Sequence, residues 1–252
     1  GQEYSDGDDS GFNAYGEGLT DDRLLLLGNT NPDPRNIGSF HQEYVYNSFF
    51  GKLDYNFNEK YYATASIRND ESSKFSPGHL RATFWSGGLA WEAKKENFLK
   101  DVSWIDNLTL KANVGTSGNS EIGNYTSPAL VSPNAQYNGV KGYNVTNPGS
   151  PNLTWEQHLK STFGINLSVL DRFHLDLSYY IDKGTNELAP VPYPETAVPP
   201  NSATIFPYGI LTNAVTLVNN GLDIDFSVDL WKDRARKGYL NFFVKTEITH
   251  NK

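Results

Sequence analysis

Residues 49–68 read FFGKLDYNFNEKYYATASIR, and this stretch decides the fold class. Apolar and polar side chains alternate on both sides of the triplet at residues 58–60. Before the triplet, one face carries Phe49, Gly51, Leu53, Tyr55 and Phe57, and the other carries Lys52, Asp54 and Asn56. A period of two indicates a β-strand, and a three-residue break is short enough for a tight turn. The stretch therefore predicts two antiparallel strands joined as a hairpin.

The same alternation recurs in six further segments. They cover residues 85–91, 107–114, 159–169, 173–182, 222–230 and 240–248. The segments together predict about eight strands of roughly 9–15 residues, longer than the usual five or six. Strands near ten residues with strict alternation are what a tilted crossing of a lipid bilayer requires.

The connections between these segments point the same way. Residues 58–60 and 171–172 are short links, whereas residues 116–156 and 183–213 are long ones. In an up-and-down sheet the long links then fall at one end, as in outer-membrane barrels with long extracellular loops. Aromatic residues gather at the short-turn end, where an interfacial girdle is expected: Phe57, Tyr61, Tyr62, Trp91, Phe98, Trp104, Phe173, Trp231 and Tyr239. The sequence predicts an all-β, antiparallel, up-and-down transmembrane β-barrel segment whose polar face lines the lumen.

Composition excludes several classes of protein. The net charge of −8 disfavours a nucleic-acid partner, because phosphate binding needs a positive surface. The absence of Cys excludes disulfides, thiolate zinc sites and a thiol nucleophile. No apolar run is long enough for a membrane helix, and the start shows no signal peptide. Because the chain begins at Gly1, we expect a processed protein or a piece of a larger one.

Chemistry-bearing motifs are sparse. The histidines are scattered, and neither a nucleophile elbow nor a phosphate-binding loop is present, so we expect no enzyme. The only candidate cofactor is calcium, at residues 6–17, DGDDSGFNAYGE. This segment fits a twelve-position calcium loop, with side chains of Asp6, Asp8, Ser10 and Glu17 and the carbonyl of Phe12 as ligands. A solvated acidic loop is the alternative.

Aromatic rings in the long loops are candidate ligand contacts. They are Tyr125, Tyr137, Tyr143, Tyr193, Phe206 and Tyr208. Such rings could stack on the faces of sugars while Asn and Asp bind the hydroxyls. Packing between loops, or contact with a lid protein, explains the same rings equally well.

Four stretches resemble the SusC/RagA-type TonB-dependent outer-membrane transporters of Bacteroidetes. They are FGKLDYNFNEKYYATASIRNDESSKF (residues 50–75), FLKDVSWIDNLTLKANVGTSGNSEIGNY (98–125), NLTWEQ (152–157) and VNNGLDIDFSV (218–228). The order matches that family over residues 44–252, and residues 1–43 would form an extracellular loop region. The stretch at residues 68–71 departs from the family pattern, which is more basic there and contains Gly.

The resemblance implies a bacterial outer-membrane importer of glycans or peptides that works with a SusD-like surface lipoprotein. It also implies a 22-strand barrel in contact with lipid, of which these residues would supply about eight strands. TonB would act through an N-terminal plug, and no plug-like segment or C-terminal strands are found here. Two alternatives stay open: a small autonomous outer-membrane barrel with a structural or adhesive role, and a secreted carbohydrate-binding β-domain.

Overall fold

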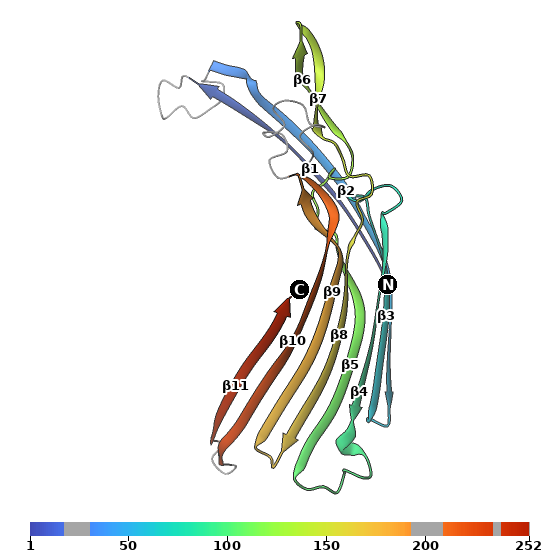
Figure 1. The fold of residues 1–252 in the computed structure, drawn as a ribbon, viewed down its shortest axis with the longest axis vertical. Coiled ribbons are helices and arrows are strands. Elements are labelled where there is room, and N and C mark those ends of the chain that lie inside the picture. Colours follow the sequence, from blue (N-terminus) through green and yellow to red (C-terminus); the bar gives the residue numbers. More distant parts are fainter. Residues whose placement is uncertain (18–30, 193–208, 234–237, 252) are drawn as a thin grey trace.

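The computed structural model describes residues 1–17, 31–192, 209–233 and 238–251. Most of these residues lie in antiparallel strands, many of them long (Figure 1). The strands are β1 (Gln2–Glu17), β2 (Asn31–Phe57), β3 (Tyr61–Ser72), β4 (Arg81–Glu92), β5 (Ile105–Asn119), β6 (Leu130–Tyr137), β7 (Val140–Asn147), β8 (Glu156–Val169), β9 (Phe173–Val191), β10 (Ile210–Asp233) and β11 (Gly238–Asn251). One short 3-10 helix, η2 (Ala93–Lys95), follows β4. Within the described residues, no helix has the length and apolar character needed to cross a membrane.

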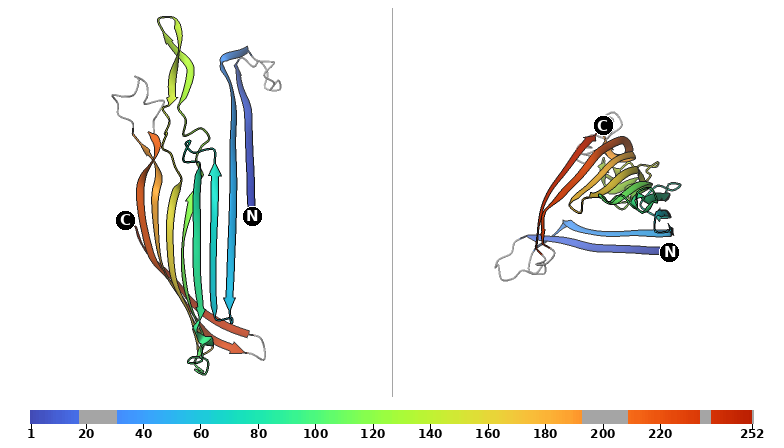
Figure 2. Two further views of the ribbon diagram at one scale, coloured as in Figure 1. Left: turned by 90° about the vertical axis from the view of Figure 1, so that its right-hand side faces the viewer. Right: turned by 90° about the horizontal axis from the view of Figure 1, so that it is seen from below.

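Nine strands form one sheet in the order β1-β2-β3-β4-β5-β8-β9-β10-β11, and β6 and β7 pair separately. The order follows the chain, which confirms the predicted up-and-down topology. The short connections lie at one end of the sheet, and the long ones lie at the other, where the β6–β7 hairpin projects beyond it (Figures 1 and 2). Seen from below, the sheet is curved, and the upper half of the β1–β2 pair leans toward the β10–β11 side (Figure 2).

Register keeps the two faces distinct from strand to strand. Leu53 pairs with Ala65, Ala63 pairs with Leu89, and Leu89 in turn pairs with Ala112. Because side chains alternate along a strand, this pairing places apolar residues of neighbouring strands on one continuous face. The apolar face is open: Leu53, Leu89 and Ile67 are each more than half exposed. A soluble sandwich would have covered that face.

Two expectations from the sequence are corrected. The loop predicted for residues 1–43 contains β1 and the first part of β2, so the sheet has nine strands instead of eight. The predicted long link at residues 116–156 contains the β6–β7 hairpin. Both segments carry polar residues or glycine on both faces, so they show no apolar alternation. Their strands are defined by backbone pairing with a neighbour, which a hydrophobic pattern does not reveal.

Candidate functional site

The face opposite the apolar one is polar and charged, and its ion pairs link neighbouring strands. The ammonium of Lys160 lies 3.5 Å from Asp182, and that of Lys245 lies 3.3 Å from Asp225. The partners sit on adjacent strands, which the register brings directly opposite each other. Opposed charges across a ladder stabilise the pairing modestly. This arrangement suits a wall that meets water instead of an apolar core.

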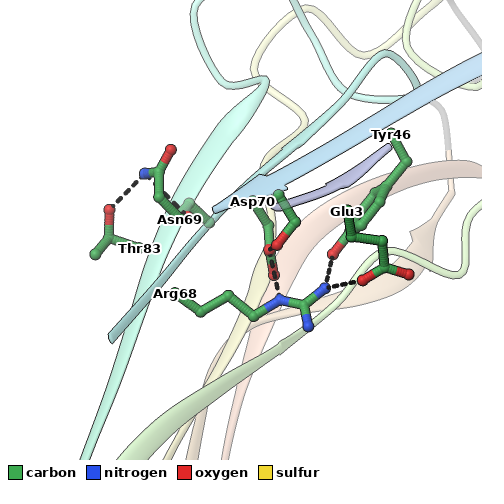
Figure 3. A network of polar contacts seen from close by, with 8 residues as sticks. Glu3, Tyr46, Arg68, Asn69, Asp70 and Thr83 are labelled. Atoms are coloured by element: carbon green, nitrogen blue, oxygen red, sulfur yellow. Dashed lines mark hydrogen bonds and ion pairs between the residues drawn. The ribbon is translucent and has the colours of Figure 1, made fainter. Parts of the chain in front are cut away.

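A denser network joins β1, β2 and β3 on the polar face (Figure 3). The guanidinium of Arg68 donates to Asp70 (2.6 Å), to the hydroxyl of Tyr46 (2.9 Å) and to Glu3 (3.1 Å). Asp70 also accepts from the hydroxyl of Ser48, and both of these residues are buried. A buried carboxylate needs such partners, because an unpaired charge away from water is costly. The network gives Arg68 and Asp70 of this stretch a structural role at the junction of β1, β2 and β3.

His158 lies between two carboxylates higher on the same face. Its Nδ1 is 3.0 Å from Asp182, and its Nε2 is 3.1 Å from Glu187. Gly184 makes room for this arrangement, since a Cβ there would lie 2.0 Å from an oxygen of Glu187. The imidazole is therefore fixed edge-on at the wall, near the end of the sheet that carries the long connections.

Loop residues and the start of β4 build a small hydrophobic cluster at that same end. It contains Phe75, Ala82, Phe84, Ile122, Leu153 and Trp155. The ring of Trp155 stacks on Phe75 at 4.7 Å and meets Phe84 edge-on at 5.8 Å, and its indole N–H donates to the carbonyl of Leu80. Trp155 is only 2% exposed, so its role is structural. The cluster ties three connections into one rigid rim.

At the opposite end, Glu96 organises the turn after β4. Its carboxylate accepts hydrogen bonds from the Tyr61 hydroxyl, the Lys60 ammonium and the Trp91 indole. These bonds, above all the one from Tyr61, hold the pKa of Glu96 below its usual value. The turn is thereby fixed to the start of β3.

Of the predicted aromatic ligand residues, the structure describes the side chains of Tyr125 and Tyr143. Tyr125 accepts a hydrogen bond from the backbone N–H of Glu43, so its loop packs against β2. Tyr143 stands on the separate β6–β7 hairpin and is 74% exposed. Tyr137 pairs with Val140 through its backbone, and its side chain lies outside the described part. Tyr193, Phe206 and Tyr208 lie outside the described residues altogether. A shared ligand site for these rings stays a prediction.

The acidic segment at residues 6–17 is extended instead of looped. Asp6, Asp8, Ser10 and Phe12 pair with residues of β2 along a regular ladder, and Glu17 pairs with Asn31. A strand rises about 3.3 Å per residue, so Asp6 and Phe12 lie about 20 Å apart along it. A calcium loop must instead bring its oxygens to about 2.3–2.6 Å from one ion. The predicted loop conformation is therefore wrong, because backbone pairing extends the segment. Calcium binding by these side chains stays an untested prediction.

One cluster escaped the sequence analysis. Asp8 of β1 and Glu43 of β2 are direct cross-strand partners, and His41 lies two residues before Glu43 on the same face. The hydrogen bond to Glu43 and the charge of Asp8 raise the pKa of the His41 imidazole. The i, i+2 spacing of His41 and Glu43 is visible in the sequence, but the third member comes from a segment read as a loop.

A hollow of about 800 Å³ lies against the apolar face. Most of its lining side chains belong to that face, among them Tyr55, Leu89, Trp91, Phe163 and Ile165. Such a surface offers few partners for a polar substrate, since specific ligand sites need placed polar groups. The polar wall and the rim are the better candidates for substrate contact.

Comparison with known proteins identifies the family. The family model described as "TonB dependent receptor-like, beta-barrel" matches residues 1–250. TonB-dependent receptor P26 of Formosa agariphila is 35% identical over 177 residues, which is 68% of this chain and 18% of that protein. TonB-dependent receptor SusC of Bacteroides thetaiotaomicron is 36% identical over 131 residues, covering 49% of this chain and 13% of SusC.

Solved structures agree with these matches. A structure of the RagAB peptide transporter superposes with a TM-score of 0.82 at 26% identity, over 99% of this chain and 27% of that one. The chain thus spans less than a fifth of the curated relatives and about a quarter of the structural neighbour. The chain belongs to the TonB-dependent receptor β-barrel family and, within it, is of the SusC/RagA type.

Proposed function

We propose that the chain forms part of the barrel wall of an outer-membrane importer for glycans or peptides. The observation that carries the proposal is the two-faced sheet: nine long strands with an exposed apolar face and a charged, ion-paired opposite face. In a transmembrane barrel the first face meets lipid and the second lines the lumen. Transport, and not catalysis, is the activity that such a wall supports.

The short-turn end supports the membrane placement. Phe57, Tyr61, Phe98 and Trp104 are all about half exposed or more, and they cluster at this end of the sheet. Aromatic rings at one depth are typical of the interface between hydrocarbon and headgroups. We place this end at the periplasmic side and the rim cluster at the extracellular side.

The projecting β6–β7 hairpin is the part of the rim that we assign to a SusD-like surface lipoprotein. Tyr143 is 74% exposed on it and Val140 is 70% exposed. The hairpin therefore presents apolar surface that a partner protein can cover. Aromatic residues with a polar tip are favoured in protein interfaces. The relatives named SusC and RagAB motivate the choice of partner, and TonB would act through a plug domain outside these 252 residues.

Substrate contact would fall to the wall and rim. The similarity to the RagAB peptide transporter motivates peptides, and glycans are the other substrate class that the resemblance to this family implies. Rings such as Tyr125 and Tyr143 can stack on either a sugar face or a peptide side chain. The charged polar face would keep the substrate's path through the lumen hydrated.

The test begins with the size and location of the native protein. An antibody against the β6–β7 hairpin should detect, in the outer-membrane fraction, a band several times larger than the chain's 28.1 kDa. Uptake of a labelled oligosaccharide or peptide mixture by the producing cell should stop when a protonophore removes the energy that TonB uses. A soluble product, or a membrane band at 28.1 kDa, would instead favour one of the two alternatives.

A substitution in the β6–β7 hairpin tests the proposed docking of the SusD-like lipoprotein. Tyr143→Asp should reduce co-purification of the surface lipoprotein at least tenfold, because it charges the exposed face of the hairpin. Leu170→Asp, which charges another exposed residue in a turn at the opposite end of the sheet, is the matched control and should change nothing. Equal loss in both variants would count against the hairpin as the docking element.

A further inference from the structure

The outer half of the β1–β2 pair brings one imidazole and two carboxylates together. Asp8 and Glu43 face each other across the ladder, and His41 occupies the next position on the same face of β2. The Nε2 of His41 is 2.8 Å from Glu43, and its Nδ1 is 3.4 Å from Asp8. One ligand atom from each of the three residues lies within 4.8 Å of the other two.

Backbone pairing fixes this geometry. Directly opposed residues in an antiparallel ladder hold their Cβ atoms about 4.5–5.5 Å apart. Two like charges at such positions repel each other, so Asp8 and Glu43 destabilise the ladder unless a cation lies between them. All three side chains are more than half exposed, so an ion can enter without moving the backbone.

We propose that Asp8, His41 and Glu43 bind a divalent transition-metal ion of the zinc type, which clamps β1 to β2. Zinc takes imidazole nitrogen and carboxylate oxygen at about 2.0–2.2 Å, so two ligand atoms of a tetrahedral site lie about 3.3–3.6 Å apart. The observed separations need only small rotations of exposed side chains to reach that range. Three protein ligands leave the fourth tetrahedral position for water.

The donor set decides the class of ion. Calcium and magnesium take oxygen ligands, whereas imidazole suits zinc, copper, nickel and iron. A site with one nitrogen and two oxygens therefore selects a borderline divalent ion over calcium. The site differs in this respect from the all-oxygen calcium loop predicted for residues 6–17, with which it shares only Asp8.

The site lies where a bound ion would affect more than one element. The loop that contains Tyr125 docks on the backbone N–H of Glu43, and Asn124 of that loop donates to Gln42. β1 has a single strand neighbour in the described sheet. A clamp between β1 and β2 would therefore stiffen both the pair and the loop that packs beside it. This inference does not depend on what the barrel transports.

The experiment titrates metal into the complete polypeptide purified in detergent. Co²⁺ serves as the spectroscopic probe, because its visible absorption reports replacement of water by protein ligands, and Zn²⁺ competition then gives relative affinity. We expect a saturable Co²⁺ band that stoichiometric Zn²⁺ removes and that excess Ca²⁺ leaves in place. The band should disappear in His41→Gln and weaken at least tenfold in Asp8→Asn and Glu43→Gln.

Two matched controls separate this site from others in the polypeptide. Asp9→Asn removes a neighbouring exposed carboxylate from the opposite face of β1, and His79→Gln removes an exposed histidine elsewhere. Both controls should bind Co²⁺ as the wild type does. Unchanged binding in His41→Gln, or displacement of Co²⁺ by Ca²⁺ at equal concentration, would overturn the proposal. Because all substituted side chains are exposed, circular dichroism should be the same for every variant.

Discussion

Replacing Trp155 by alanine should release the rim formed by the long connections while leaving the sheet intact. The indole is 2% exposed, stacks on Phe75 at 4.7 Å and donates to the carbonyl of Leu80 at 3.2 Å. Removing a buried Trp costs about 3–5 kcal/mol, because transfer energy is lost and a cavity remains. Trp155→Phe keeps ring contact but loses the indole N–H bond to the Leu80 carbonyl, which still accepts the backbone N–H of Ser72, so the expected cost is about 1–1.5 kcal/mol.

Hydrogen exchange measured by mass spectrometry reports the free energy of local opening in each peptide of the rim. Since about 1.4 kcal/mol is a factor of ten, exchange at residues 73–80 and 148–155 should accelerate by about two to three and a half orders of magnitude in Trp155→Ala. Trp155→Phe should give about a tenfold change, and Trp104→Ala, which alters a 56% exposed ring at the other end, should give none. The reasoning fails if Trp155→Ala stays within threefold of wild type in these peptides, or if exchange rises equally in β8 and β9.

The remaining predictions concern the turn, the lipid face and the polar network. The interactions of Glu96 should be fully present above pH 4.5, its usual pKa, and should be lost as pH falls through its lowered folded-state pKa; carboxyl-carbon NMR, assigned with Glu96→Gln, measures this. Leu53→Arg on the exposed apolar face should lower folding stability in lipid vesicles by about 2–4 kcal/mol, whereas Thr64→Arg on the polar face should cost little. Asp70→Asn should weaken the hold on Arg68 and lower stability by about 1–3 kcal/mol in urea unfolding, without changing the apolar face.

Much of the barrel wall could be predicted from the sequence. Some strands have one apolar face, as at residues 49–57 and 222–230. There, the alternation predicts that the strand exists and which of its residues point to each face of the sheet, as the pairing confirms. The lengths of the links at residues 58–60 and 171–172 fixed which end carries the tight turns. These features are local, because a period of two and a short turn are written in neighbouring residues.

Other features depend on residues far apart in the chain. β1 lacks apolar alternation, so only its pairing with β2 shows that the acidic segment is a strand. The rim cluster joins Phe75 to Trp155, eighty positions later, and the Arg68 network joins three strands. These contacts exist only after the sheet has brought distant segments into register.

The sequence by itself thus determined an all-β wall with one face for lipid and one for water. The physical reason is that a nonpolar solvent on one side imposes a periodic pattern on each strand separately. Only the tertiary structure decided which polar side chains meet, because hydrogen bonds and ion pairs between strands follow register and not composition. Asp8, His41 and Glu43 illustrate this: the sequence relates His41 to Glu43 by their spacing, but only the β1–β2 ladder places Asp8 on the same face.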